Sequence, residues 1–583
     1  MILMVGGHHL NLKHIFNLKT IIIFILILTS SLYSSVSISG RSKVEYENFK
    51  VAGNAVNPNL ATKGDNPLIQ LDLSFIGTLN SFLKAGAILR FENNLRGFYG
   101  TGDIFQAREV FVQTILLNFI RLNLGDFRKS LTRLTLWADE KEFEYESKLF
   151  LLQREDAKYQ AYLTEKNSWP LEGLDLKAEF NIENFQNYPF PNEFSIEGFI
   201  ARIDTASESK SYDRYFSAAR ICFYNSEIVK VGGTGVFIND LKETKSLTPI
   251  YSPIAINIFA SDISINLIEM LFKNKNIKLK MDSEIAKSIT TTNSFEYLPK
   301  KLADTGLILK AEAGLSETKA YVKIIDIGNE FLSPGAQSWT FNYYGQNYLP
   351  EQNLTNSLFF RNYNSKLQII HRWNLPLNIS MPFSDATPNR NGLGFGFNSK
   401  NLDFIEFSLK KELLKEIRPT GCKELKNFNI SEAGGKIYLD KFFDIKFFPV
   451  LNIIYFNEEI KRNDDKNTLN FDESENLKTK LFGSGAEFYF LEELIFLFAY
   501  QKIEQKGKVF FPVSQTNTPI IITGYQKYFA NFVTTVYSFG FYYKFSKLSS
   551  LRAEYTKIKY ENKSNSNSNY TLDLIKLYYY ISF

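Results

Sequence analysis

The sequence predicts an all-β protein in which about 20 antiparallel strands, within a range of roughly 16 to 26, close into a large transmembrane barrel. Three observations support this prediction. Segments in which apolar and polar side chains alternate strictly recur from about residue 68 to the end. Aromatic residues make up 15% of the chain. The last ten residues, 574–583, carry one apolar row that ends on Phe583.

Composition excludes two other classes of protein. The 583 residues have a mean hydropathy of −0.17 and 22% charged residues, which rules out a membrane protein built from many apolar helices. A barrel exposes only every second residue of a strand to lipid, so its mean hydropathy resembles that of a soluble protein. Lys and Arg number 67 against 62 Asp and Glu, an excess too small and too dispersed for binding nucleic acid.

The N-terminal residues 1–39 are predicted to be a secretory signal peptide. Lys13 and Lys19 precede the apolar run IIIFILIL at 21–28, and a serine-rich stretch with possible cleavage sites follows. An uncleaved membrane anchor is the alternative, but a spanning helix needs about twice this apolar length. The predicted barrel therefore comprises residues 40–583.

Four segments show the two-residue period most clearly: 83–92, 174–184, 276–285 and 307–315. In 174–184, for example, Leu174, Leu176 and Ala178 alternate with charged residues. A helix would scatter these apolar residues around its axis. The polar rows are expected to line the lumen, and the candidate lining residues are Lys84, Arg90, Glu92, Arg121, Asp175, Lys177, Glu179, Glu183, Lys278, Lys280, Asp282, Glu284, Lys310, Glu312, Arg552 and Glu554.

The C-terminal third predicts hairpins with short turns at one end and long polar loops at the other. Segments 477–490 and 494–504 are joined by three residues, whereas 457–476, 505–524 and 562–569 read as long loops. This asymmetry is typical of barrels with tight periplasmic turns and long external loops. Residues 138–165 do not alternate and are predicted to form an inserted helix or a loop folded into the lumen. A soluble β-sandwich would show the same alternation, so the ends of the chain must decide between the two folds.

The terminal segment LIKLYYYISF at 574–583 places Ile575, Leu577, Tyr579, Ile581 and Phe583 on one face. This pattern resembles the C-terminal signal by which the barrel-assembly machinery recognises bacterial outer-membrane proteins. The stretch 108–137 resembles the hairpin of porin-type proteins in which a strand ends in Gly-Asp and turns inward. The resemblance implies location in the outer membrane, contact with its lipids, and the assembly machinery and periplasmic chaperones as partners. It identifies no specific family and no oligomeric state.

Few residues suggest catalysis. His371 is the one histidine beyond the N-terminal region, and Cys222 and Cys422 lie too far apart in sequence to define a metal motif or a required disulfide. We therefore expect no enzyme activity, no metal and no cofactor. The leading functional hypothesis is a porin-like channel for passive passage of small polar solutes. The alternative is a non-conducting outer-membrane scaffold or a component of secretion or assembly.

Overall fold

The structure is a computed structural model, and it describes most of the chain after residue 34. The described residues are 35–54, 63–78, 82–93, 103–137, 143–160, 165, 167–181, 192–204, 212–225, 228–241, 253–268, 277–292, 300–336, 384–419, 424–443, 449–463, 474–513, 524–566 and 569–583. His371, Cys422 and Glu183 lie outside these ranges, as does most of the predicted signal peptide.

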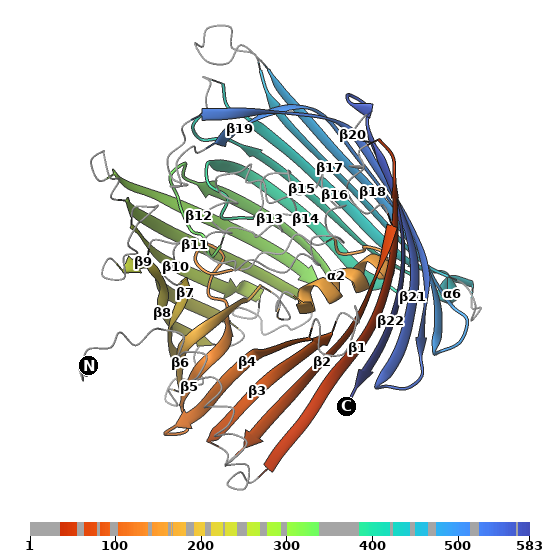
Figure 1. The fold of residues 1–583 in the computed structure, drawn as a ribbon. Helices are drawn as coiled ribbons and strands as arrows, with labels where there is room; N and C mark the ends of the chain where they lie inside the picture. The colour runs from red at the N-terminus through yellow and green to blue at the C-terminus, as the bar shows by residue number, and fades with distance from the viewer. Residues whose placement is uncertain are drawn as a thin grey trace, which may run out of the picture.

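Twenty-two antiparallel strands form one sheet that closes on itself (Figure 1). Each strand pairs with its neighbours in sequence, and β1 also pairs with β22. The strands are β1 Ser35–Ala52, β2 Lys63–Thr78, β3 Leu83–Asn93, β4 Asp103–Leu116, β5 Ile120–Lys129, β6 Trp169–Asn181, β7 Glu193–Asp204, β8 Asp213–Asn225, β9 Val229–Leu241, β10 Ile254–Asn266, β11 Ile277–Thr292, β12 Lys300–Leu315, β13 Thr318–Ile327, β14 Arg390–Leu402, β15 Ile405–Lys415, β16 Asn427–Tyr438, β17 Val450–Arg462, β18 Glu475–Tyr489, β19 Leu494–Val513, β20 Gly524–Lys544, β21 Ser549–Asn562 and β22 Tyr570–Ser582. The predicted all-β barrel is confirmed, and its strand number falls within the expected range.

Alternation along the strands separates an inner face from an outer face. On β22, Leu574, Lys576 and Tyr578 are buried, whereas Ile575 and Leu577 between them are 51% and 42% exposed. Large apolar residues are exposed in the same way on almost every strand around the wall. A surface of this kind is stable only in an apolar surrounding, so we assign the outer face to lipid.

The connections differ at the two ends of the barrel, as the sequence predicts. The turns β4–β5, β12–β13 and β14–β15 need only two or three residues, 117–119, 316–317 and 403–404. The longest connections, 130–168 and 328–389, both join strand ends at the opposite end of the wall. We refer to the two ends as the short-turn end and the long-connection end. Three strands extend further into the predicted loops than expected. β17 ends at Arg462 and β18 begins at Glu475, both within the predicted loop 457–476, and β19 ends at Val513, within 505–524.

The first strand begins earlier than the predicted signal peptide allows. β1 starts at Ser35, and Ser35–Ser39 pair with Thr78–Ser74 of β2. Cleavage after residue 39 would remove these five positions but would leave Arg41 and the rest of β1 paired with β22. The position of cleavage stays a prediction.

The wall is incompletely paired between β4 and β5. Backbone pairing covers only Phe111–Leu116 of β4 and Ile120–Gly125 of β5. Gly125 has a φ of +104°, a left-handed conformation that favours glycine, and β5 diverges from β4 at this residue. Beyond Gly125, side-chain contacts take the place of main-chain hydrogen bonds between the two strands. The Asp126 carboxylate accepts a hydrogen bond from the Val110 N–H at 2.6 Å, and Arg128 pairs with Glu109.

The interior of the barrel is more apolar and more filled than the sequence suggested. The largest buried apolar cluster lies on the inner faces of β5 to β13 and extends over β15 to β20, with members such as Phe216, Ile238 and Ile256 at 0 or 1% exposure. Residues 130–137, 328–336 and 384–389, which we call the inserted segments, contribute Leu134, Phe331 and Ala386 to this cluster. The sequence analysis expected polar rows along the lumen and an insertion only within 138–165, and it did not anticipate this apolar part of the interior. Residues that alternate with lipid-facing ones can equally pack against chain folded inside the barrel.

Hydrogen bonds hold the inserted segments together and to the wall. The indole Nε1 of Trp169 donates to the Gly335 carbonyl at 2.8 Å, and the Trp137 N–H donates to the same oxygen at 2.7 Å. The carboxylate of Glu284, on β11, accepts the N–H groups of Arg133 and Leu134 at 3.1 and 2.9 Å. Buried main-chain groups away from strands need such partners, so these contacts make the inserted segments a defined part of the interior.

Candidate functional site

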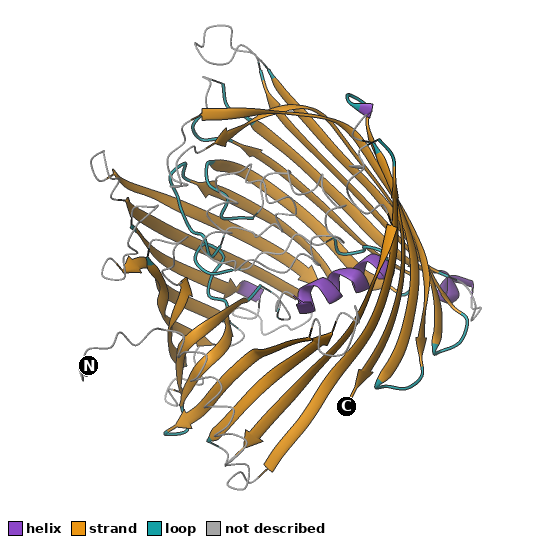
Figure 2. Cartoon of the chain, viewed as in Figure 1, coloured by secondary structure: helices purple, strands orange, loops and turns teal. Residues whose placement is uncertain are grey.

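A 13-residue helix, α2 Lys148–Gln160, lies inside the ring of strands (Figure 2). It belongs to the stretch 138–165 for which the sequence suggested an inserted helix or lumen loop. The N-terminal half of α2 packs through Leu149 against Ile495, Leu497 and Ala499 of β19. A second, five-residue helix, α6 Leu439–Phe443, joins β16 to β17 at the short-turn end.

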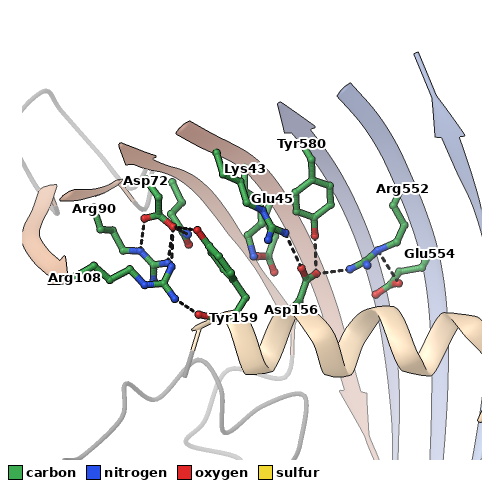
Figure 3. A network of polar contacts seen from close by, with 12 residues as sticks. Lys43, Glu45, Asp72, Arg90, Arg108, Asp156, Tyr159, Arg552, Glu554 and Tyr580 are labelled. Atoms are coloured by element: carbon green, nitrogen blue, oxygen red, sulfur yellow. Dashed lines mark hydrogen bonds and ion pairs between the residues drawn. The ribbon is translucent and has the colours of Figure 1, made fainter. Parts of the chain in front are cut away.

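Asp156 attaches the C-terminal half of α2 to strands on both sides of the closure between β22 and β1. Its carboxylate accepts hydrogen bonds from Arg552 of β21 at 2.7 Å, from the Tyr580 hydroxyl of β22 at 2.6 Å, and from Arg41 of β1 at 3.4 Å (Figure 3). One carboxylate therefore joins three neighbouring strands to the helix.

Tyr159 makes a second attachment one helical turn further on. Its hydroxyl donates to Asp72 of β2 at 2.5 Å, and its ring lies under the guanidinium groups of Arg108 and Arg41, 4.1 and 4.2 Å from the ring centroid. Asp72 also accepts a bidentate pair from Arg90 at 2.7 and 2.8 Å and a bond from Arg108 at 2.8 Å. Arginine forks and aromatic faces suit such partly buried sites because guanidinium is planar and weakly hydrated.

The surroundings shift the pKa values of both helix residues. Burial favours the neutral form of Asp156, but the charges of Arg552 and Lys43 outweigh it and hold the pKa of this carboxyl below its ordinary value of 3.8. Burial, together with the hydrogen bond to Asp72, raises the pKa of Tyr159, although Arg108 opposes the shift. At neutral pH, Asp156 is therefore an anion and Tyr159 a neutral donor.

Together these groups form a contiguous charged surface on β21, β22 and β1 to β4, which we call the seam network. It contains six basic residues and five acidic ones, a net charge of 6 − 5 = +1. The basic members are Arg41, Lys43, Arg90, Arg108, Arg552 and Lys576, and the acidic members are Glu45, Glu47, Asp72, Asp156 and Glu554. Because nearly every charge has a partner, this surface holds α2 rather than exposing free charge.

A second charged row crosses the inner face from β5 to β10. Lys129 pairs with Asp175 at 2.7 Å and with Glu197 at 2.9 Å. Arg220 pairs with Asp262 through two bonds of 2.7 and 2.8 Å. The row contains two basic and three acidic residues, a net charge of 2 − 3 = −1, and every one of them has a partner.

The inner face at the short-turn end carries a third set of charges, and these remain in contact with solvent. We call them the vestibule residues. Six are basic, namely Arg121, Lys177, Lys230, Lys278, Lys280 and Lys319, and all are exposed or, for Lys177, half-buried. Four acidic residues face them on the same surface: Glu179, Asp282 and Glu312, with side chains 45%, 34% and 25% exposed, and Glu193, which is half-buried. Glu179 pairs with Lys177 at 2.6 Å and Asp282 with Lys280 at 3.0 Å, and six basic residues against four acidic ones leave a local excess of 6 − 4 = +2.

The register places the described candidate lining residues on the inner face. Arg121 lies opposite Lys177, Asp282 opposite Lys310, and Lys280 opposite Glu312. Arg90 pairs with Asp72 across β2 and β3, and Lys84 and Glu92 share its face. Arg552 and Glu554 belong to the seam network, Asp175 to the second row, and Glu284 to the attachment of the inserted segments.

The sequence reasoning missed much of the seam network. Arg41, Lys43, Glu45 and Glu47 alternate with Ser42, Val44 and Tyr46 in RSKVEYE, a signal that was available but lay between the predicted signal peptide and the first expected strand. Asp156 and Tyr159 could not have been found, because their importance arises only from where the helix lies.

The described part of the chain contains no group of three or more His, Cys, Asp or Glu side chains arranged to hold a metal ion. Nor does any described helix have the length and apolar character needed to cross a membrane.

Comparisons with known proteins add little beyond architecture. No family model and no curated protein matches the sequence. Similar solved structures include OprD of Pseudomonas aeruginosa, with 10% identity and a TM-score of 0.35 over 95% of this chain and 96% of that one. A BenF-like porin from Pseudomonas fluorescens has 8% identity and a TM-score of 0.34, covering 95% and 100% of the two chains. The siderophore receptor PirA of Pseudomonas aeruginosa has 9% identity and a TM-score of 0.36, covering 94% and 80%.

These similarities are too low to carry an argument about activity or family. The molecule's own features are more informative: a closed antiparallel wall, an apolar outer face and connections of unequal length at the two ends. Closure matters because a sheet with a free edge cannot satisfy its main-chain groups in lipid. The chain is thus a transmembrane β-barrel protein of the bacterial outer-membrane type, with no specific family identified.

Proposed function

We propose that this protein is an outer-membrane channel for passive passage of small polar solutes, with a weak preference for anions. The vestibule residues carry this proposal. Rings of fixed charge in a wet lumen bias which ions enter, and here six solvent-accessible basic side chains face four acidic ones. The two ion pairs within the set reduce the excess, so the preference is weak.

The chain folded inside the barrel beyond the vestibule supports the limit to small solutes in this proposal. α2 and the inserted segments occupy part of the cross-section, and both are attached to the wall by ion pairs and apolar contacts. An open 22-stranded barrel without such contents would be far wider than small solutes require.

The test is a recording from the purified full-length protein in a planar bilayer with a potassium chloride gradient. We expect stepwise conductance and a reversal potential displaced toward that of chloride. Replacing Arg121 and Lys278 with Gln should move the reversal potential toward zero, because both face the vestibule and are exposed. Replacing the outward-facing Lys287 with Gln is the matched control and should change nothing. A reversal potential displaced toward potassium would contradict the anion preference.

A non-conducting scaffold or a secretion or assembly component is the second candidate, and the inserted segments favour it. Leu134, Leu136 and Phe331 of these segments are fully buried inside the barrel, as expected of a permanent plug. A bilayer that stays sealed at high protein loading would support this role. Conductance that appears only when Asp156→Asn and Tyr159→Phe are combined would show that α2 closes the pore.

A further inference from the structure

The outer surface of β17 to β22 changes character sharply along the barrel axis. From the short-turn end the outward residues are apolar or aromatic, up to a belt that includes Phe482, Tyr500, Tyr537 and Tyr555. Tyr500 and Tyr537 lie with ring centroids 5.2 Å apart, and Phe482 and Tyr500 6.2 Å apart. Aromatic belts of this kind mark the boundary between the hydrocarbon and the headgroups of a membrane.

Lysines begin immediately beyond the belt. Lys480, Lys502 and Lys557 each follow the belt residue of their own strand by two positions toward the long-connection end, and therefore point outward like it. The outward orientation is supported on β18 and β19 by the intervening Leu481 and Ile503, which are fully buried on the inner face. We call the outward lysines of this region the lysine band; they are Lys461, Lys478, Lys480, Lys502, Lys506, Lys508, Lys557 and Lys559.

The lysine band has a net positive charge. Four outward acidic residues accompany the eight lysines, namely Glu459, Glu504, Glu561 and Asp573, which leaves 8 − 4 = +4. Each acid is paired with one lysine: Glu459 with Lys461 at 2.8 Å, Glu504 with Lys502 at 2.6 Å, Asp573 with Lys557 at 3.9 Å, and Glu561 with Lys559. The side chains of Lys461, Lys502, Lys557 and Lys559 are still 42 to 55% exposed.

The band does not continue all the way round the barrel. On β9 and β10 the outward residues, from Val231 to Leu241 and from Ala255 to Ile265, include no charged side chain. A charged surface needed only for solubility beyond the membrane would have no reason to be missing from these two strands. The position at the headgroup level and the sign of the charge identify the complementary partner.

We propose that the lysine band binds phosphate-bearing lipid headgroups in the membrane leaflet at the long-connection end. Lysines just beyond the hydrocarbon boundary attract anionic headgroups, and each contributes a measurable part of the affinity. The belt tyrosines lie on the hydrocarbon side of the lysines. A lipid bound here therefore places its acyl chains against the aromatic rings and its headgroup against the lysines. This inference is independent of whether the lumen conducts.

The test uses the purified full-length barrel in a neutral detergent and native mass spectrometry to count retained lipid. The probes are lipid A, which carries phosphate groups, and phosphatidylcholine, which has no net charge. The test variant combines Lys480→Gln, Lys502→Gln and Lys557→Gln. The matched control combines Lys287→Gln, Lys544→Gln and Lys547→Gln, three exposed lysines outside the band.

We expect the native protein to retain lipid A in preference to phosphatidylcholine and the test variant to retain about tenfold less lipid A. The control should retain as much as the native protein, and added salt should weaken retention through screening. Equal retention by the two variants, or equal retention of the two lipids, would overturn the proposal. Complete displacement of lipid A by an equimolar amount of inorganic phosphate would also overturn it, because the site would then be one for free phosphate. Heat-modifiable migration of every variant on a gel verifies that each has folded.

Discussion

Gly40 and Phe583 exchange two main-chain hydrogen bonds, Gly40 N–H to Phe583 O at 2.8 Å and Phe583 N–H to Gly40 O at 3.0 Å. The last residue of the chain thereby joins the strand at which the barrel begins. The pairing continues from Arg41 opposite Ser582 to Ala52 opposite Thr571. Closure removes the exposed edges that β1 and β22 would otherwise present to lipid.

Gly40→Val should impair barrel assembly. A Cβ atom at Gly40 would overlap the ring of Phe583, so a larger side chain must displace the last residue of the closing strand. The expected result is a smaller heat-modifiable fraction on a gel after refolding in detergent. Ser42→Val, two residues along the same face and opposite Ile581, is the control and should assemble normally. Equal assembly of both variants would show that this contact is dispensable.

Leu577→Arg should destabilise the barrel in a bilayer. Leu577 is 42% exposed on the outer face of β22, where a cation at mid-membrane depth costs about 2–4 kcal/mol. Ser264→Arg, on the inner face of β10 opposite Asp282, places the same charge in the lumen and should be tolerated. Denaturant unfolding in liposomes measures the difference between the two free energies of unfolding. A smaller loss for Leu577→Arg than for Ser264→Arg would contradict the assignment of faces.

Asp72→Ala should be among the most destabilising changes to the seam network. It would leave the side chains of Arg90 and Arg108, 4% and 3% exposed, without their shared carboxylate, and removing one partner of a buried ion pair costs about 3–5 kcal/mol. Asp282→Ala is the control: its carboxylate is 34% exposed and its pair with Lys280 should contribute about 0–1 kcal/mol. Equilibrium unfolding of both variants gives the comparison, and equal losses would argue against a buried network.

Acidification should release α2, but only at low pH. The pKa of Asp156 is lowered in the folded protein, so the stabilisation it provides is fully present above its ordinary pKa of 3.8 and is lost as the pH falls through the lower folded value. Conductance should therefore be constant from pH 8 to about pH 5 and should change only below about pH 4. In Asp156→Asn this acidic transition should disappear, whereas Glu155→Gln, an exposed change on the same helix, should keep it. A transition in the native protein near pH 6 would mean that another group controls the helix.

Much of the wall was predictable because its physical cause is local. Alternation along β3, β6, β11 and β12 appears directly in the sequence, since successive side chains of a strand point to opposite faces. The short turns at 491–493 and 545–548 and the apolar row ending on Phe583 are equally local. The expected strand number was imprecise partly because β1 lies in a region that had been attributed to the signal peptide and the segment after it.

The contents of the lumen were not predictable in the same way. Phe216 and Ile238 alternate with lipid-facing residues whether the interior is water or packed chain, so the pattern does not distinguish the two. Which face of each strand meets lipid, and that the strands form one closed wall, follow from the sequence by itself through the two-residue period and the C-terminal row. Tertiary structure decided that β1 meets β22 at Gly40 and Phe583, that Asp156 of α2 reaches Arg552, and that the inserted segments pack against the inner face. These contacts join residues far apart in the sequence, and no local pattern records such a distance.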